Sequence, residues 1–195
     1  MNWGQAKTMV QTYTHRGDID LDAAQIPACD RMSQVLDVQD NENIASAAMA
    51  ASVDLPNAFE APLAADYARM KTVRIAGKTY KPTSMLILSE WGNCAQMYAI
   101  ANSKLYAGAS GQLTYAYGRQ VQPIADDLST NEILTRFPRI YLYAVVIEAF
   151  IQIQDFDAAG GYVPAFGEAV DDANNLQAFA RFDSGLAVTS GFRRI

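Results

Sequence analysis

The sequence predicts an α+β protein: a mainly helical bundle of about four helices, interrupted by a β-rich insertion and followed by an extended C-terminal tail. Apolar residues recur every three or four positions towards both ends of the chain, whereas they alternate with polar residues in the middle. Strands grouped between helices favour α+β over a repeated βαβ fold. We therefore expect bundle helices over residues 1–45, the β-rich insertion over 46–128, further bundle helices over 129–182 and the tail over 183–195.

Two helices are expected near the N-terminus. The first covers residues 2–14, where one face is formed by Trp3, Ala6, Val10 and Tyr13. Asp22 can cap a second helix with Pro27 near its start, because a carboxylate accepts hydrogen bonds from the free N–H groups of a first turn. One face of that second helix carries Ile26, Cys29, Ser33 and Leu36.

The middle of the chain has the two-residue period of strands. Residues 73–80 predict two short strands around a glycine turn, and residues 97–101 and 104–107 predict a second hairpin. Alternation marks a later strand with one buried face, formed by Leu113, Tyr115 and Tyr117. Between the hairpins, Ser84 can cap a short helix that ends at Gly92.

Helical spacing returns at residues 129–132, which fit the pattern of a capping box. Pro138 restarts the helix, since proline is tolerated at a first helical position. Residues 140–153 are apolar on nearly all sides, which predicts the most buried element of the fold. A final helix over about residues 158–181 carries one apolar face, formed by Tyr162, Phe166, Val170, Ala173 and Leu176.

Composition excludes several classes of protein. The net charge of −6 argues against a surface that coats nucleic acid, which would be basic. No secretory signal is evident, and the longest apolar run, residues 140–147, is far shorter than the ~20 residues of a membrane span. We expect a soluble protein that is made in a cytoplasm and binds no membrane. Cys29 and Cys94 are expected to be free thiols, although one bridge between them stays open.

Charge is distributed in blocks along the chain. Residues 17–68 hold ten carboxylates and one arginine, whereas residues 69–81 hold five basic side chains and no acid. Residues 120–172 are acidic again, and residues 181–195 are basic. Such blocks suit a subunit that docks on copies of itself or on fixed partners, although solvated faces without a partner would have the same pattern.

The residues do not form a recognisable catalytic or metal-binding set. His15 is the single histidine, and a zinc site needs about four nitrogen or sulfur ligands. Residues 108–112 (GASGQ) depart from the nucleophile-elbow pattern at their last position. We therefore expect no catalytic residue, no cofactor and no metal ligand, and we do not expect an enzyme.

Glu148 is the one carboxylate inside the apolar segment. A buried unpaired charge is costly, so Glu148 should have a partner. The candidate partners are Arg136, Arg139 and Arg181. A polar latch within one subunit is favoured over a contact between subunits.

Several blocks in order resemble the head-to-tail adaptor (connector) proteins of tailed bacteriophages, over about residues 20–185. The most specific block is residues 130–138 (TNEILTRFP), followed by residues 140–144 (IYLYA) and by Glu148 with Ala149. Residues 54–59, 73–77 and 104–107 also fit, and so do Tyr162, Phe166, Ala169, Arg181 and Phe182. The glycines of residues 157–161 and the whole of residues 59–69 fit poorly, so insertions cannot be placed there.

The resemblance implies a structural role in the virion neck or tail, with assembly in the host cytoplasm. Such adaptors form a ring, generally twelve-fold, that docks on the portal, connects it to the tail or nozzle, and lines the channel through which double-stranded DNA passes without specific binding. The resemblance implies a portal-binding tail that includes Gly185, Leu186, Phe192, Arg193, Arg194 and Ile195. The core and latch residues would be Pro138, Tyr141, Tyr143, Glu148 and Arg181.

Two other interpretations stay open at this point. The protein could be another neck or tail component, such as a stopper or a tail-completion protein. A small phage-borne hydrolase is the remaining alternative, and it would need a nucleophile such as Ser110.

Overall fold

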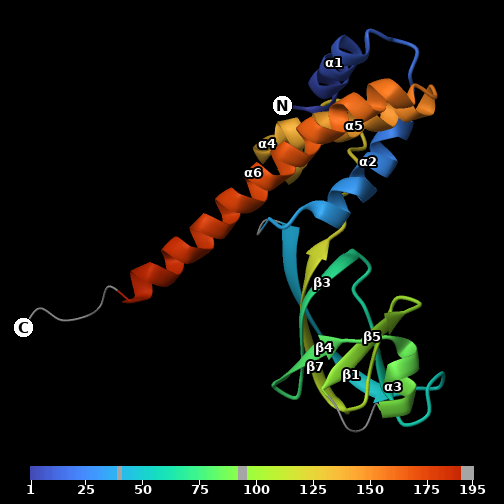
Figure 1. Ribbon diagram of the computed structural model, residues 1–195, viewed down its shortest axis with the longest axis vertical. Helices are drawn as coiled ribbons and strands as arrows, with labels where there is room; N and C mark the ends of the chain where they lie inside the picture. The colour runs from blue at the N-terminus through green and yellow to red at the C-terminus, as the bar shows by residue number, and fades with distance from the viewer. Residues whose placement is uncertain (39–40, 92–95, 190–195) are drawn as a thin grey trace, which may run out of the picture. The chain divides into compact units, whose positions relative to one another are not determined.

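The computed structural model describes residues 1–38, 41–91 and 96–189, and the chain divides into two compact units (Figure 1). The helical unit consists of residues 1–41 and 120–195, and the barrel unit of residues 42–119. The described helices of the helical unit are α1 (Trp3–Thr14), α2 (Leu21–Val35), α4 (Glu132–Arg136), α5 (Pro138–Gln152) and α6 (Phe156–Thr189).

The barrel unit is a sheet closed on itself, with one short helix, α3 (Met85–Trp91). Its strands are β1 (Glu42–Ala51), β2 (Phe59–Pro62), β3 (Tyr67–Ile75), β4 (Lys78–Pro82), β5 (Met97–Ala101), β6 (Lys104–Ala107) and β7 (Gly111–Arg119). They close in the order β1–β2–β6–β5–β4–β3–β7. The β4–β5 pair is parallel, and α3 lies on the crossover that such a pair requires.

The expected mainly helical bundle of about four helices is therefore wrong. The described residues form six helices, and the middle of the chain is a closed seven-stranded barrel. The largest omission is β1, whose sequence is ENIASAAMAA. Alanine is depleted in strands, and its small side chain is only weakly apolar. The β1 sequence therefore lacks the clear alternation of apolar and polar residues that predicts a strand. The antiparallel pairing of β1 with β7, from Glu42↔Gly118 to Met49↔Gly111, overrides that local preference.

Both predicted hairpins are confirmed. The β3–β4 turn has left-handed backbone at Ala76 and Gly77, with φ of 48° and 80°. The β5–β6 turn has it at Asn102 and Ser103, with φ of 49° and 58°. Two consecutive left-handed residues form the turn whose twist matches the flanking strands. The predicted alternation in β7 is also confirmed, because its inward residues are buried: Leu113, Tyr115 and Tyr117.

Helix α5 is the centre of the helical unit and packs against α1, α2, α4 and α6. Every residue from Ile140 to Phe150 is buried except Tyr143, which is half-buried. This confirms the prediction of a helix that is apolar and covered on nearly all sides. The surrounding helices contribute apolar faces to the same core, including Trp3, Ala24, Met32, Phe166 and Val170.

Two of the predicted helix caps are wrong by two residues. The Asp20 side chain caps α2 by accepting from the Ala23 N–H (3.0 Å), whereas Asp22 accepts from Trp3 Nε1 (2.6 Å). Asn131, and not Ser129, caps α4 by accepting from the Leu134 N–H (2.8 Å). The sequence offers several acceptors at each helix start, and tertiary contacts decide which of them is used.

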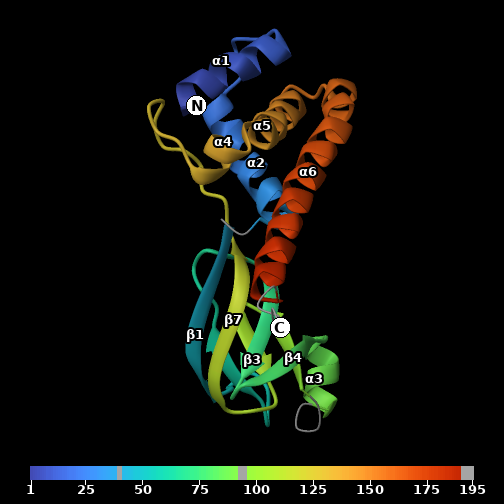
Figure 2. The same cartoon turned by 90° about the vertical axis from the view of Figure 1, so that its left-hand side faces the viewer.

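The predicted extended tail is wrong for residues 183–189, because α6 continues to Thr189. Leucine, alanine and valine at residues 186–188 sustain the helix, and Gly185 costs it only about 1 kcal/mol. Residues 190–195 lie outside the described residues. With 34 residues, α6 is about 51 Å long, whereas the 15 residues of α5 span about 22 Å. Figures 1 and 2 both show α6 running beyond the other helices of its unit.

Candidate docking groove of the helical unit

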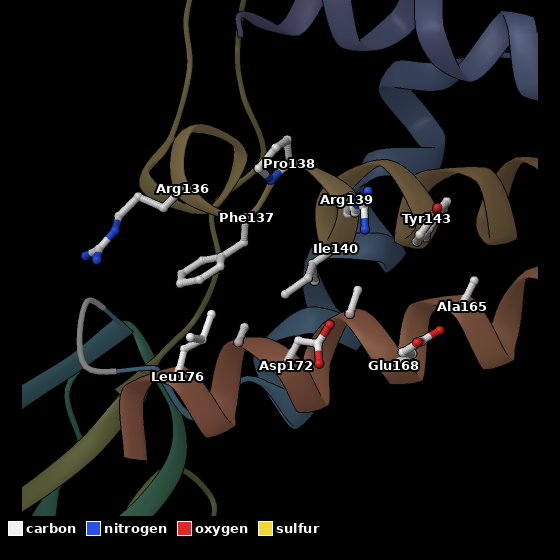
Figure 3. A pocket seen from close by; sticks show the side chains of 12 residues that line it. Arg136, Phe137, Pro138, Arg139, Ile140, Tyr143, Ala165, Glu168, Asp172 and Leu176 are labelled. Carbon is white, nitrogen blue, oxygen red and sulfur yellow. The ribbon is translucent and has the colours of Figure 1, made fainter. Parts of the chain in front are cut away.

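A groove of about 380 Å³ lies between the start of α5 and the middle of α6 (Figure 3). One wall comes from the end of α4 and the start of α5, and consists of Arg136, Phe137, Pro138, Arg139, Ile140 and Tyr143. The other wall comes from α6 and consists of Ala165, Glu168, Ala169, Asp172, Ala173 and Leu176. We call this the α5–α6 groove.

The break between α4 and α5 shapes the first wall. Phe137 leaves the helical conformation (φ −127°, ψ 57°), and its N–H donates to the Ile133 carbonyl (2.8 Å) to close α4. Pro138 then starts α5, as predicted, at a position where the missing N–H has no helical partner to lose. The break leaves Arg136 at the end of α4 and Arg139 in the first turn of α5, both exposed.

The two walls carry opposite charge above an apolar floor. Glu168 and Asp172 lie one turn apart on α6, and Asp172 turns towards α5 in Figure 3. Within the described residues, the side chains of Arg139, Glu168 and Asp172 make no hydrogen bond or ion pair. Ile140 and Ala173 are buried between the walls, whereas Leu176 is 66% exposed at the margin. This arrangement suits an apolar side chain of another protein flanked by charged groups.

Glu148 is anchored by Arg31 of α2. Its Oε1 accepts from Arg31 Nε (2.9 Å) and Nη2 (2.6 Å), and Glu148 is only 8% exposed. The partner therefore differs from the three candidates inferred from the sequence, Arg136, Arg139 and Arg181. Arg31 could have been noticed as the single basic residue within the acidic residues 17–68. The pair joins α2 to α5 inside one subunit.

Comparison with known families decides what kind of protein carries this groove. The model of the SU10 adaptor protein family matches residues 1–193. The chain belongs to the SU10 adaptor protein family. The match confirms the resemblance to phage head-to-tail adaptors that the sequence had indicated. No curated protein matches the chain.

The adaptor is thus a structural component of a phage virion. Residues 130–138, the block that carried most of the resemblance, form α4 and the proline that opens α5. Part of that block lines the α5–α6 groove. In the part of the adaptor that the structure describes, no helix is both long and apolar enough to cross a membrane.

Tyr141 of α5 takes part in a buried network of hydrogen bonds in the helical unit. Its hydroxyl donates to Gln25 Oε1 (3.0 Å), and the same oxygen accepts from the Ile124 N–H (3.0 Å). Gln25 Nε2 donates back to the Ile124 carbonyl (2.9 Å). Burial raises the pKa of Tyr141, so the phenol stays protonated and remains a donor. These bonds join α2 and α5 to the segment before α4, which is a structural role.

Cys29 lies beside this network, with its Sγ 3.7 Å from the Tyr141 hydroxyl. Burial raises the pKa of the Cys29 thiol to about 11, so little thiolate exists near neutral pH. We predict that iodoacetamide at pH 8 leaves Cys29 unmodified in the folded adaptor and alkylates it fully in guanidinium chloride, as followed by peptide mass spectrometry. The prediction would be contradicted if iodoacetamide alkylated Cys29 in the folded protein as fast as it alkylates the cysteine of a short peptide.

Tyr143 lines the groove and belongs to an aromatic cluster. Its ring lies 6.4 Å from that of Tyr13 and 6.1 Å from that of Tyr162, and Phe150 stacks on Tyr162 at 5.8 Å. This aromatic cluster joins α1, α5 and α6. Each such ring pair stabilises a fold by about 0.5–1.5 kcal/mol beyond its burial. Pro138 and Tyr143 line the groove, whereas Tyr141 and Glu148 are buried and are not among its lining residues.

Only some of the predicted tail residues lie within the described part of the chain, which ends at residue 189. Gly185 and Leu186 belong to the last turns of α6, and the backbone of Arg181 lies one turn before them in the same helix. Phe192, Arg193, Arg194 and Ile195 lie outside the described residues. A role of these residues in binding the portal stays a prediction.

The titratable residues considered from the sequence are separate from one another. His15 ends α1 in left-handed conformation (φ 52°) and is exposed. Cys29 is buried in the helical unit, and Cys94 is outside the described residues. Across residues 1–38, 41–91 and 96–189, no three His, Cys, Asp or Glu side chains are grouped so that they could hold a metal ion.

Proposed function

We propose that copies of this adaptor form a ring, twelve-fold as in other head-to-tail adaptors, that docks on the portal and joins it to the tail or nozzle. The observation that carries this proposal is the length of α6. Asn174 holds α6 to the end of α2, where it accepts from the Asp37 N–H (2.7 Å) and donates to the Val35 carbonyl (3.2 Å). The helix then continues to Thr189, which leaves a long projecting segment for a partner.

The end of that segment has the composition of a docking peptide. Phe192 and Ile195 are apolar, and Arg193 and Arg194 are cationic. A few aromatic and arginine residues commonly supply most of the free energy of binding at protein interfaces. Together with Gly185 and Leu186, these residues are our proposed contact with the portal.

The charge of the helical unit supports a channel through which DNA passes without being held. Its sequence contains sixteen Asp and Glu residues and eight Lys and Arg residues. An acidic wall repels phosphate groups, so it favours sliding over binding. The barrel unit, with five acidic and seven basic residues, differs in sign and is the part that we assign to the tail side.

The direct test is co-expression with the portal protein of the same phage, followed by electron microscopy of the purified particles. We expect a second ring on the narrow end of the portal, and portal rings alone when the adaptor is omitted. Bare portal rings beside a folded adaptor, with capture of the adaptor by a tail component instead, would favour a stopper or tail-completion role.

A further inference from the structure

Leu128 is the most exposed large apolar side chain among the described residues of the helical unit, at 85%. It lies in the loop of residues 126–129, before α4. One exposed leucine is ordinary on a protein surface, because apolar atoms form more than half of that surface. What distinguishes Leu128 is how firmly its loop is held.

The carboxylate of Asp126 organises this loop. Its Oδ1 accepts from the N–H groups of Leu128 and Ser129 (both 3.0 Å), and its Oδ2 accepts from the Ser129 hydroxyl (2.7 Å). The backbone on either side of Leu128 is also fixed from α1. Trp3 N–H donates to the Ser129 carbonyl and Gly4 N–H to the Asp127 carbonyl, both at 2.9 Å.

Close packing and an ion pair complete the support. Lys7 Nζ lies 2.5 Å from Asp127 Oδ1. A Cβ atom added at Gly4 would lie 3.2 Å from the Asp127 Cβ, so α1 and the loop are in tight contact. Leu128 is therefore presented by a preorganised loop, and an interaction that uses it would lose little conformational entropy on binding.

The α5–α6 groove has the complementary chemistry. Its floor is apolar, and Arg136 and Arg139 carry positive charge on the α5 wall. The loop offers one apolar side chain next to two carboxylates, Asp126 and Asp127. The loop lies on the side of α4 and α5 away from α6 (Figure 2), so it and the groove occupy opposite sides of the unit.

We propose that Leu128 of one copy inserts into the α5–α6 groove of the next copy, with the carboxylate of Asp126 beside Arg139. Glu168 and Asp172 form the opposite wall, where they repel an acidic loop and so permit one orientation only. A contact between two different surfaces is head-to-tail, and it generates a ring when the rotation between copies closes. The inference rests on the proposed function only in that it names the contact between ring neighbours.

The test compares three variants of the full chain. Leu128→Asp removes the inserted side chain, and Arg139→Glu with Leu176→Asp changes two exposed residues of the groove. Leu86→Asp is the matched control, since Leu86 is also an exposed leucine (69%) but lies on α3 of the barrel unit. Circular dichroism checks that each variant is folded. Self-association is measured by sedimentation velocity over a concentration series, and ring formation by electron microscopy with the portal.

We expect the loop variant and the groove variant each to weaken self-association at least tenfold and to form no complete ring, whereas Leu86→Asp behaves as the unchanged chain. A mixture of the loop and groove variants should recover one intact contact and form dimers. Unchanged rings from Leu128→Asp would overturn the inference and leave the adaptor function standing. The absence of dimers in the mixture would likewise overturn the inference.

Two further outcomes concern the proposed function. If the unchanged chain neither associates in solution nor forms a ring on the portal, both the Leu128 contact and the adaptor ring are refuted. If the unchanged chain associates and Leu128→Asp does not, but no ring forms on the portal, the proposed function alone is refuted.

Discussion

Deletion of residues 185–195 is expected to abolish binding to the portal while both units stay folded. The last described buried residue of α6 is Ala173, and the last described hydrogen bonds from α6 to α2 come from Asn174. The deletion therefore removes no described contact of the core. Loss of two or three interface hot spots would weaken binding by roughly a hundredfold or more. Surface plasmon resonance on immobilised portal rings measures this change directly.

A matched pair of full-length variants tests whether binding depends on the positive charge of the tail or only on the presence of the tail. Arg193→Lys with Arg194→Lys keeps both charges, whereas Arg193→Glu with Arg194→Glu reverses them. We expect the lysine variant to retain most of the affinity and the glutamate variant to lose it. A truncated adaptor that binds the portal as tightly as the full chain would contradict the assignment of these residues.

Arg31→Ala should produce the largest loss of stability among single charge deletions in the helical unit. It leaves the carboxylate of Glu148 buried without its donor. A broken buried ion pair costs about 3–5 kcal/mol, and the 35% exposure of the Arg31 side chain lowers our expectation to about 2 kcal/mol. Urea unfolding followed by circular dichroism of the helices measures the difference.

Arg16→Ala is the control for this experiment. Arg16 pairs with Asp18 at 2.8 Å, but the two side chains are 47% and 66% exposed. Exposed pairs contribute about 0–1 kcal/mol, so this variant should be nearly neutral. Arg31→Met combined with Glu148→Gln should recover much of the stability, because no buried charge is then left unpaired. Equal losses for Arg31→Ala and Arg16→Ala would show that Glu148 does not depend on its partner.

The sequence predicted helices well where packing imposes a period. The first helix was expected over residues 2–14 and is Trp3–Thr14, and Pro138 starts α5 as expected. The prediction failed at β1, because its alanines favour helix over strand. The strand that pairs with it, β7, begins sixty residues after β1 ends, so no local pattern marks the pairing. The prediction also failed at residues 183–189, where glycine and serine suggested an extended chain. Both errors concern segments whose conformation depends on more than local periodicity.

The candidate site could be predicted only in part. Residues 130–138 were singled out, and Pro138 and Tyr143 line the groove. Glu168 and Asp172 were missed, since each wall is an ordinary charged helix face until α5 and α6 are packed together. Arg31 was missed for the same reason, because 117 positions along the chain separate it from Glu148. Contacts between distant segments of a chain leave no local pattern to recognise.

The pairing of Glu42 with Gly118 has a consequence for how this protein can be altered. These residues lie near the two ends of the barrel unit, and paired strands are only about 4.8 Å apart, so the chain enters and leaves the barrel at one place. An insert with adjacent ends can be exchanged without separating the segments that flank it. The barrel unit can thus be replaced as a whole without moving the two segments of the helical unit that flank it. Related adaptors can therefore differ in the barrel unit while they keep the same helical unit.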